Sequence, residues 1–560
     1  MRSRSPAGSR PPLTLVLAAL VTAANAAKPA TVDDTAYLLF ARHLAAHPAD
    51  PYGFDIFWWS APEPAMGVLL PPLLPYWLAL GIKLFGEHVA LLKLWLFPFV
   101  WLLAWALGAL LRRFARGAER FALPPLVLSA AVLPTLNLML DVPAVALALA
   151  SVELFARASA RRDWRLAMLS GLVAALAMQT KYSAFVAPAA ILWFGLTHRR
   201  VAFAVRSVGV CAAAFVAWEL SLVPLYEESH FAHHAGASGG PPGLVKKLDL
   251  IGPLAGYLGC LAAGAGLLAL SVLRLPRGVT VCAAALWGIG FALVALLPNR
   301  LTALAPDVTL AGAFWPLAGA VWYLATAACA GVLLLRVRNG LSVRTHRAAL
   351  FVVGWFVIEV VAALALTPFA AARRVIGVSL VMGLLAARAA SRLGRVDPAR
   401  RPPRWAPAFG IAVGVLVAAI DAFDAYPERV CAERAAALVR ADGAPPGATA
   451  WYTGHGGFQY YYEHEGMRAL VVGRTAARAG DYLVLPVYPD GDDFPRPHTG
   501  SGVPHPPAAV ADPLGDVLWD DPLSAKTVPN FYGGTDPVAG RDAPRLRVRV
   551  YRVKAEWEVR

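Results

Sequence analysis

The sequence contains few charged residues for its length. Of its 560 residues, 16% are charged and 58% are hydrophobic, whereas soluble domains have about 25% charged and roughly 45–50% apolar residues. The mean hydropathy is +0.55. This composition excludes a soluble globular enzyme, a disordered chain and a disulfide-rich secreted module. The long, repeated apolar runs instead predict helices that cross a membrane.

Cysteine motifs are absent as well. The chain has five cysteines, of which four lie in apolar runs and Cys431 lies in the polar C-terminal part. No CxxC pair exists, so neither a zinc site nor a disulfide framework is indicated. The sequence also has no internal repeat and no low-complexity tract.

Positive charge exceeds negative charge, with a formal net charge of +15. The placement of the arginines excludes nucleic acid as the partner, because they gather in short loops between apolar runs. The positive-inside rule assigns such loops to the cytoplasm. The arginine-rich segments are the N-terminal RSRSPAGSR, 112–120, 157–165, 336–347 and 391–404.

The apolar runs predict about 13 transmembrane helices. The first, 13–27, is short and fits either an uncleaved span or a cleavable signal peptide. Starting inside, the alternation places every arginine-rich loop in the cytoplasm, so we expect a multi-pass protein of the cell (inner) membrane. The further spans are 88–111, 122–140, 142–156, 166–180, 183–197, 201–224, 250–272, 278–297, 311–335, 348–367, 374–390 and 405–423.

Two parts of the chain are expected outside the cytoplasm. The membrane domain is 1–423, and its first outer loop, 28–87, carries an amphipathic segment that predicts surface helices. The remainder, 424–560, contains short apolar runs typical of strands, including ATAWY and RLRVRVYRV. We predict a small extracytoplasmic α/β domain there, in which 451–466 forms a strand, a glycine turn and an amphipathic helix.

Three aspartates are candidates for chemistry. Asp33 and Asp34 follow the first span; one of them suits a general base, although a solvated helix cap explains the pair equally simply. Asp141 stands between two apolar runs, where an ionisable group is usually functional, the alternative being a turn at a hairpin tip. All three fall on the outer side, as a shared site requires.

Basic groups fall on the same side. Lys181, Arg373 and Arg374 follow apolar runs there and can pair with an aspartate, anchor at lipid headgroups or hold a phosphate. In YEESHFAHHAG, His230 and His234 are spaced to share a helix face and form a metal pair; the alternative is a polar loop, with His233, that lines an acceptor site. No HExxH motif and no third ligand accompany the pair, so we expect no metal cofactor.

Several stretches together resemble the membrane glycosyltransferases of the GT-C superfamily, most closely the family 39 group of protein O-mannosyltransferases and lipid A aminoarabinose transferases. They are VDDTAYLLFARHL, LLPPLLPYWLALGIKLFGE, LNLMLDVPAVALALA and LSGLVAALAMQTKYSAF, in that order, and the resemblance covers residues 12–390.

The resemblance implies transfer of a sugar from a polyprenyl-phosphate donor to an acceptor hydroxyl outside the cytoplasm. It gives Asp33 the role of catalytic base with Asp34 beside it, makes Asp141 a second active-site carboxylate and matches Lys181 to a family position. The family usually has a basic residue before Pro-Pro-Leu, but this chain has Leu70. Phosphate binding is therefore expected from other cations, Lys181 with Arg373 or Arg374.

Two other functions fit the same composition. A polytopic transporter or flippase of lipid-linked sugars would need charged residues near mid-membrane, whereas the aspartates here stand at the outer ends of spans. A non-catalytic membrane scaffold is the third possibility, favoured by the absence of a basic residue at Leu70. The sugar and the acceptor are not specified by the sequence.

Overall fold

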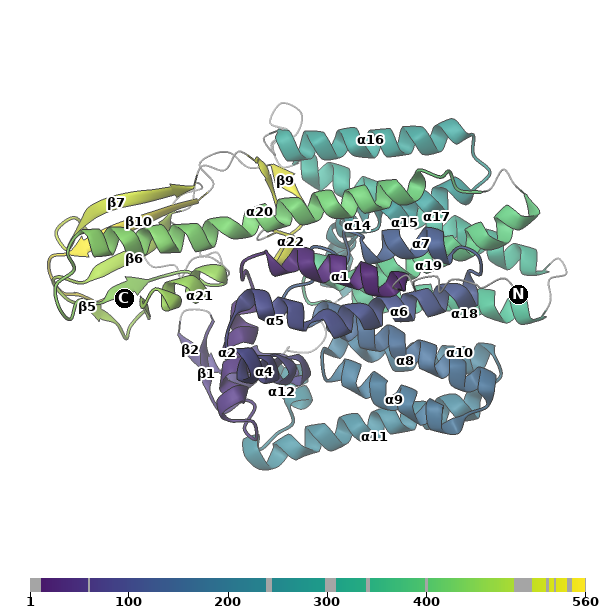
Figure 1. Ribbon diagram of the computed structural model, residues 1–560, viewed down its shortest axis with the longest axis horizontal. Helices are drawn as coiled ribbons and strands as arrows, with labels where there is room; N and C mark the ends of the chain where they lie inside the picture. Colours follow the sequence, from purple (N-terminus) through teal and green to yellow (C-terminus); the bar gives the residue numbers. More distant parts are fainter. Residues whose placement is uncertain are drawn as a thin grey trace, which may run out of the picture.

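The apolar runs form a helical bundle, and the polar C-terminal part forms a small sheet at one end of it (Figure 1). The computed structural model describes residues 12–58, 61–237, 244–297, 309–338, 343–397, 401–487, 506–519, 523–527, 530–540 and 546–558. The predicted fold class, a helical polytopic membrane protein with a C-terminal α/β region, is confirmed.

Within these residues, eight helices are long and apolar enough to cross a membrane. A bent pair, broken by 80° around residue 262, makes a ninth if it counts as one span. The eight are α5 with α6 (Val89–Trp95, Phe97–Phe114), α8 (Asp141–Arg161), α11 (Val201–Tyr226), α16 (Arg277–Leu296), α17 (Leu310–Arg338), α18 (Val343–Leu366), α19 (Ile376–Val396) and α20 (Ala406–Ala441). The bent pair comprises α14 (Ile251–Leu261) and α15 (Ala263–Val272), preceded by α13 (Leu244–Asp249).

Shorter helices complete the bundle and its outer end. Four of these segments are apolar: α1 (Leu13–Ala26), α4 (Leu73–Phe85), α9 (Trp164–Met178) and η1 with α10 (Tyr182–Phe185, Val186–Thr197). The others are α2 (Asp34–Ala46), α3 (Ala65–Val68), α7 (Glu119–Val127), α12 (His230–Ala237) and η2 (Ala372–Arg374), with the hairpin strands β1 (Asp55–Phe57) and β2 (Pro62–Pro64). Helix α2 forms where a helix was predicted after the first span, and most of its residues are buried in protein.

The predicted span 122–140 is not one continuous helix. Helix α7 ends at Val127, after Pro124 and Pro125, and residues 128–140 form turns and bends. Proline cannot donate a backbone hydrogen bond, which explains the early end. Every residue from 129 to 140 is buried, so the irregular backbone is enclosed by protein, as it must be at membrane depth.

The C-terminal region contains a five-stranded sheet of order β4-β3-β6-β10-β7. Strand β3 runs parallel to β4 and β6, whereas β10 is antiparallel to β6 and β7. The predicted strand, glycine turn and helix are confirmed as β3 (Ala450–Tyr452) and α21 (Gly457–His464). The remaining elements are β4 (Arg468–Ala469), β5 (Ala476–Ala477), β6 (Tyr482–Val487), β7 (Ala511–Trp519), β8 (Ala525–Lys526), α22 (Asn530–Gly533), β9 (Ala539–Gly540), β10 (Leu546–Val553) and β11 (Trp557–Glu558).

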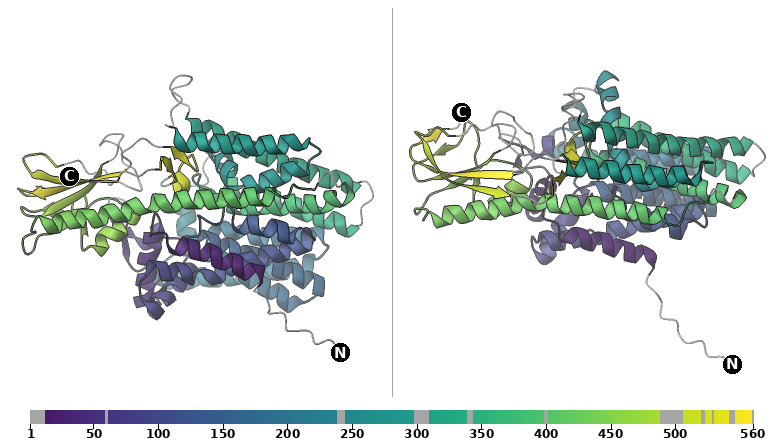
Figure 2. Two further views of the ribbon diagram at one scale, coloured as in Figure 1. Left: turned by 45° about the horizontal axis from the view of Figure 1, so that its top comes forward. Right: turned by 90° about the horizontal axis from the view of Figure 1, so that it is seen from above.

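Helix α20 joins the two regions without a break, running from the bundle onto the sheet (Figure 2). The domain boundary predicted at residue 424 therefore lies inside a helix. Beyond it, Cys431 and Ala435 pack against Tyr482 and Val548 of the sheet in one apolar cluster. The C-terminal region is thus held to the bundle by a rigid element.

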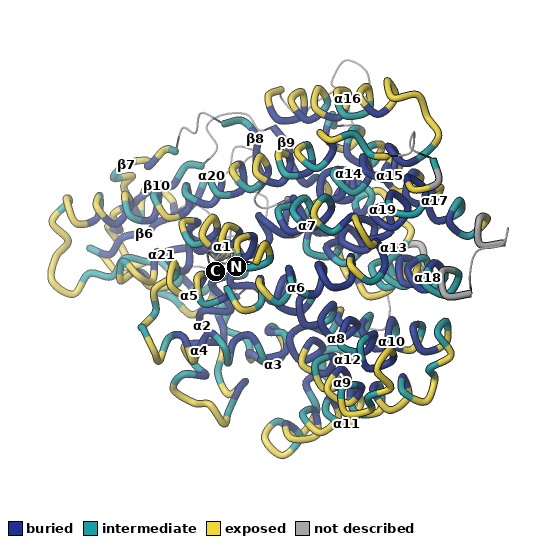
Figure 3. Tube along the Cα trace, turned by 45° about the vertical axis from the view of Figure 1, so that its right-hand side comes forward, coloured by how far each residue is buried: buried dark blue, intermediate teal, exposed yellow. Residues whose placement is uncertain are grey.

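Burial follows a pattern expected for a protein surrounded by lipid. The bundle centre is buried, whereas the outer faces of α11 and α16 are exposed (Figure 3). Leu220 on α11 is 62% exposed and Leu286 on α16 is 66% exposed. Exposed leucines on long apolar helices suit contact with acyl chains and not with water.

Candidate active site

The chain reaches Asp33 through a strained turn. Helix α1 ends at Ala26, and Asp33 is the N-cap of α2. Val32 between them has a φ of +50°, a left-handed conformation that β-branched residues rarely adopt. Such strain persists only where surrounding contacts enforce it. The carboxyl group of Asp33 therefore extends from a loop whose backbone is fixed.

Contacts with the C-terminal region help to hold Val32 in this conformation. The backbone N–H of Ala30 donates to the Tyr461 hydroxyl at 2.9 Å, and the Thr35 hydroxyl donates to the carbonyl of Gly456 at 2.5 Å. Gly456, with a φ of +67°, lies so close that a Cβ there would be 3.3 Å from Cα of Val32. The glycine turn after β3 thus packs directly on the loop that carries Asp33.

Asp33 pairs with Arg373. Residue Arg373 lies in η2, the short turn between α18 and α19, and its Nη1 donates to Oδ2 of Asp33. The two side chains are 14% and 13% exposed. The pair is therefore mostly enclosed but can still be reached by a ligand.

Asp141 pairs with Lys181. Asp141 is the first residue of α8, and Lys181 immediately precedes η1. Their side chains form an ion pair and are 4% and 6% exposed. Burial, together with repulsion from Arg374, lowers the pKa of Lys181 to about 8, although the Asp141 carboxylate opposes the shift.

The two ion pairs belong to one cluster. Arg373 and Arg374 both interact electrostatically with the two carboxylates, Asp33 and Asp141. Three cations and two carboxylates meet, which gives a formal net charge of 3 − 2 = +1. The structure thus brings together five of the residues singled out in the sequence, from four connections far apart along the chain. We name this group the outer charge cluster.

Asp34 occupies a different environment from Asp33. Its side chain is fully buried, Oδ1 accepts from the backbone N–H of Leu138 at 2.8 Å, and Oδ2 accepts from that of Thr31 at 3.3 Å. Nζ of Lys93 is 3.5 Å from Oδ2. Burial raises the pKa of Asp34, and Lys93 opposes that shift. Asp34 therefore ties the loop that carries Asp33 to the irregular segment before α8.

A second buried network supports the same loop and was not foreseen from the sequence. Nζ of Lys93 donates to the carbonyls of Lys28 and Pro29 at 2.8 and 2.9 Å. Lys28 itself pairs with Asp421 of α20 and donates to the Tyr532 hydroxyl at 2.9 Å. The sequence did contain one sign of this network, namely Lys93 inside the apolar run VALLKLW. A charged residue within a span is rarely without a role.

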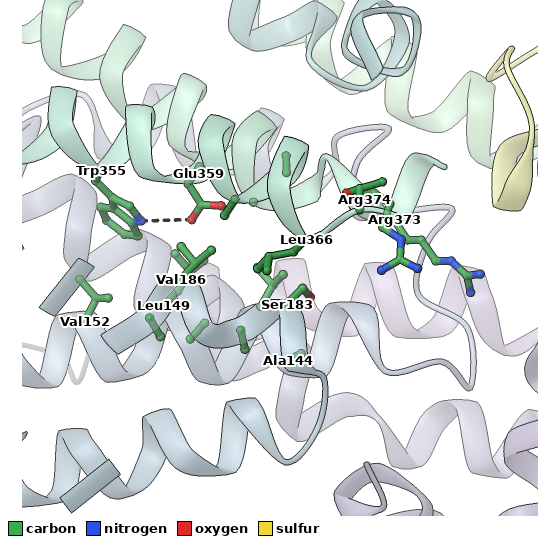
Figure 4. A pocket seen from close by; sticks show the side chains of 18 residues that line it. Ala144, Leu149, Val152, Ser183, Val186, Trp355, Glu359, Leu366, Arg373 and Arg374 are labelled. Atoms are coloured by element: carbon green, nitrogen blue, oxygen red, sulfur yellow. Dashed lines mark hydrogen bonds between the residues drawn. The ribbon is translucent and has the colours of Figure 1, made fainter. Parts of the chain in front are cut away.

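An apolar groove opens at the outer charge cluster. It lies between α8, α10, α18 and α19, has a cavity volume of about 80 Å³ and has Arg373 and Arg374 at one end (Figure 4). At the other end, Nε1 of Trp355 donates to Glu359 at 3.1 Å. Alanine, valine and leucine side chains supply most of the lining between them, among them Ala144, Ala148, Leu149, Val152, Val186 and Leu366.

The histidine segment packs on the loop before Pro71. Nε2 of His230 and Nε2 of His234 lie 2.9 and 3.0 Å from the carbonyl oxygen of Leu69, and His233 pairs with Glu228. Burial lowers the pKa of His230 to about 3, so this ring is neutral. Across the residues described, no three His, Cys, Asp or Glu side chains gather as a metal site would require. We therefore assign His230 and His234 to holding α12 in place.

No protein-family model and no curated protein sequence matches the chain. Among solved structures, the oligosaccharyltransferase AglB of Archaeoglobus fulgidus, in complex with an inhibitory peptide and a dolichol-phosphate, is 12% identical, with 84% of this chain and 69% of that chain covered and a TM-score of 0.45.

ArnT of Cupriavidus metallidurans, bound to undecaprenyl phosphate, is 15% identical, with 85% and 93% covered and a TM-score of 0.40. At these identities, the roles of side chains do not transfer from one chain to another.

Proposed function

We propose that the chain is an integral-membrane glycosyltransferase that moves a sugar from a polyprenyl-phosphate donor to an acceptor hydroxyl. The observation that carries this proposal is the outer charge cluster at the mouth of an apolar groove. A lipid phosphate needs both features in one place: cations for its head and an apolar channel for its tail.

Asp33 is the proposed catalytic base. A general base must be able to reach the hydroxyl whose proton it takes. Asp33 is partly exposed and only one of its oxygens is held by Arg373, whereas both oxygens of Asp34 are occupied and its side chain is fully buried. In this proposal Asp34 acts as a positioning residue that fixes the loop.

Arg374 and Lys181 are the proposed ligands of the donor phosphate, with Arg373 orienting Asp33. Transfer of the sugar leaves negative charge on the phosphate, and preorganised positive charge is usually the largest contribution to lowering such a barrier. The cluster carries one cation more than its carboxylates neutralise. In the proposed mechanism Asp141 holds Lys181 in place beside the phosphate.

The groove between α8 and α18 is the proposed site for the first isoprene units. Its lining is mostly apolar and it begins at the two arginines (Figure 4). A chain of hydrocarbon gains about 25 cal/mol for each Å² of apolar surface removed from water. Tail burial would therefore contribute to affinity, while the cations select the phosphate.

The arginine-rich loops favour an orientation in which the outer charge cluster and the C-terminal region face away from the cytoplasm. The outer charge cluster lies at the end of the bundle next to the sheet, because the loop that carries Asp33 contacts the C-terminal region through Thr35 and Gly456. In this orientation the acceptor approaches from the extracytoplasmic side of the cell (inner) membrane.

A transfer assay in proteoliposomes tests the proposal. Purified chain is incubated with a panel of radiolabelled undecaprenyl-phosphate sugars and an envelope extract as the source of acceptor. Label moved to the extract supports an enzyme. Label that crosses the bilayer unchanged indicates a transporter of lipid-linked sugars, and neither result indicates a scaffold. Asp33→Asn should lose transfer, while Asp55→Asn, an exposed aspartate outside the cluster, should keep it.

A further inference from the structure

A second charged cavity lies at the opposite end of the bundle. It is formed where α6, α8 and α19 end, and its cavity volume is about 640 Å³. Six arginines and one glutamate line it together with Ala109 and Ala160: Arg112, Arg113, Arg116, Arg157, Arg161, Arg392 and Glu153. We name it the inner arginine pocket.

The pocket holds far more positive than negative charge. Glu153 is the one carboxylate among the lining residues, and it already binds Arg113 at 3.1 Å and Arg157 at 2.8 Å. The formal charge is 6 − 1 = +5. Among the residues that the structure describes, no carboxylate pairs with the other four arginines. Cations this close repel one another, and an anion bound between them offsets that repulsion.

The partial negative charges at the helix C-termini offset only part of this positive charge. Three helices direct their C-termini here, and each carries a partial charge of about −0.5. Together they supply roughly −1.5 against the arginines' excess, so a positive surplus remains. A contact between arginine and tryptophan indicates the depth of the pocket in the membrane. The guanidinium of Arg157 lies 4.8 Å from the ring of Trp105. Tryptophan and arginine are typical of the boundary between hydrocarbon and headgroups.

The pocket is separate from the outer charge cluster. Asp141 begins α8 and Arg161 ends it, so the 21 residues of the helix place the two sites about 30 Å apart at 1.5 Å per residue. A donor whose phosphate lies at Arg374 therefore does not reach Arg161 with that same phosphate. The inner arginine pocket needs a ligand of its own.

We propose that the inner arginine pocket binds a phosphate-bearing anion at the cytoplasmic face. Arginine matches phosphate because its planar fork donates two parallel hydrogen bonds, and basic pockets between transmembrane helices at this face suit phospholipid headgroups. The excess of positive charge fits a ligand with one or two phosphate groups. An anionic lipid headgroup and a free phosphate compound share this chemistry.

Binding to two probes distinguishes the sources. The full chain is placed in nanodiscs of phosphatidylcholine with or without phosphatidylglycerol, and retained lipid is measured by native mass spectrometry. In parallel, inorganic pyrophosphate is titrated onto the chain in phosphatidylcholine alone, and binding is followed by calorimetry. Retention of phosphatidylglycerol identifies a headgroup site, and binding of pyrophosphate identifies a site for a free phosphate compound.

The variant Arg112→Gln/Arg116→Gln/Arg161→Gln tests the residues, all three of which are exposed. The matched control is Arg199→Gln/Arg200→Gln/Arg206→Gln, which removes the same charge at the same end of the bundle but outside the pocket. We expect at least a tenfold loss of the bound probe in the pocket variant and none in the control. Should the triple variant fail to fold, Arg161→Gln against Arg199→Gln makes the same comparison.

Two results would overturn the proposal. Equal losses in the pocket variant and the control would mean that the arginines act only as general surface charge. Absence of binding of both probes by the unaltered chain would mean that the pocket takes no phosphate ligand. Neither result depends on whether the chain transfers sugars.

Discussion

The two ends of α8 carry opposite arrangements of charge. At its start, the outer charge cluster opposes three cations with two carboxylates, and the pairs are mostly enclosed. At its end, the inner arginine pocket sets six arginines against one glutamate in an open cavity. Binding an anion needs one sign of charge, whereas transferring a group from it also needs a base. Both oxygens of Glu153 bind arginines, whereas Asp33 has only one oxygen bound to a cation, so under the proposed function only the outer arrangement provides both.

The largest effect expected from this comparison is loss of the base. Asp33→Asn keeps the shape of the side chain but removes its capacity to take a proton, and general-base catalysis contributes about 10²–10⁴-fold. We expect transfer to fall by roughly that factor while binding of undecaprenyl phosphate is retained, because the cations remain. Rates from single-turnover assays check this. A variant as active as the unaltered chain would remove Asp33 from the mechanism.

The next largest effect is expected when a side chain proposed to bind the donor phosphate is removed. Arg374→Ala and Lys181→Ala each remove a charged hydrogen bond, worth about 1.5–3 kcal/mol, so we expect affinity for undecaprenyl phosphate to fall about 10- to 100-fold. Equilibrium binding measures it. Arg42→Ala is the control, since Arg42 lies at the same end of the bundle but pairs with Glu87. Unchanged affinity in both cluster variants would refute the phosphate assignment.

The pH dependence of donor binding should follow Lys181. Its pKa is lowered from 10.5 to about 8 by burial, so the lysine loses its proton, and the cluster loses one positive charge, as the pH rises through 8. We expect affinity for undecaprenyl phosphate to decline above that pH. Lys181→Arg keeps its charge and should bind the lipid with little change over the same range. A decline of equal size in Lys181→Arg would assign it to another group.

A smaller effect is expected from the glycine turn that packs on the loop that carries Asp33. Gly456→Ala places a Cβ against Val32 at a φ of +67°, and we expect the turnover rate to fall severalfold with donor affinity unchanged. Gly473→Ala is a matched control, because Gly473 has a φ of +71° and open space around it. Equal losses in the two variants would show that backbone strain, and not contact with Val32, is responsible.

The smallest effect should come from the inner arginine pocket. Arg112→Gln/Arg116→Gln/Arg161→Gln leaves the outer charge cluster untouched, and we expect sugar transfer within about twofold of the unaltered chain, within the scatter of surface substitutions. Initial rates in proteoliposomes measure it. A loss as large as that of Asp33→Asn would contradict the division of roles between the two ends.

Local pattern predicted much of this fold. Apolar runs identified the helices, and alternation from an inside N-terminus placed Asp33, Asp141, Lys181 and Arg373 at one end. The strand and helix on either side of Gly456 were likewise predicted from spacing and glycine content. These features depend on neighbouring residues only, which a sequence displays directly.

Ion pairs between residues far apart along the chain could not be predicted from the sequence. Asp33 meets Arg373 across 340 positions, and Lys28 meets Asp421 across 393. Nothing local distinguishes these partners from other charges at the same level of the bundle. The turns at 128–140 and the break near residue 262 were missed for a related reason, because apolar composition continues through both while backbone polar groups are satisfied by tertiary contacts.

A structure of the chain with undecaprenyl phosphate would test the central claim most directly. We predict phosphate oxygens within about 3 Å of Arg374 and Lys181, with the first isoprene units in the groove between α8 and α18 and an open path from Asp33 to the solvent outside. A phosphate bound away from these cations, or a tail lying outside the groove, would contradict the account.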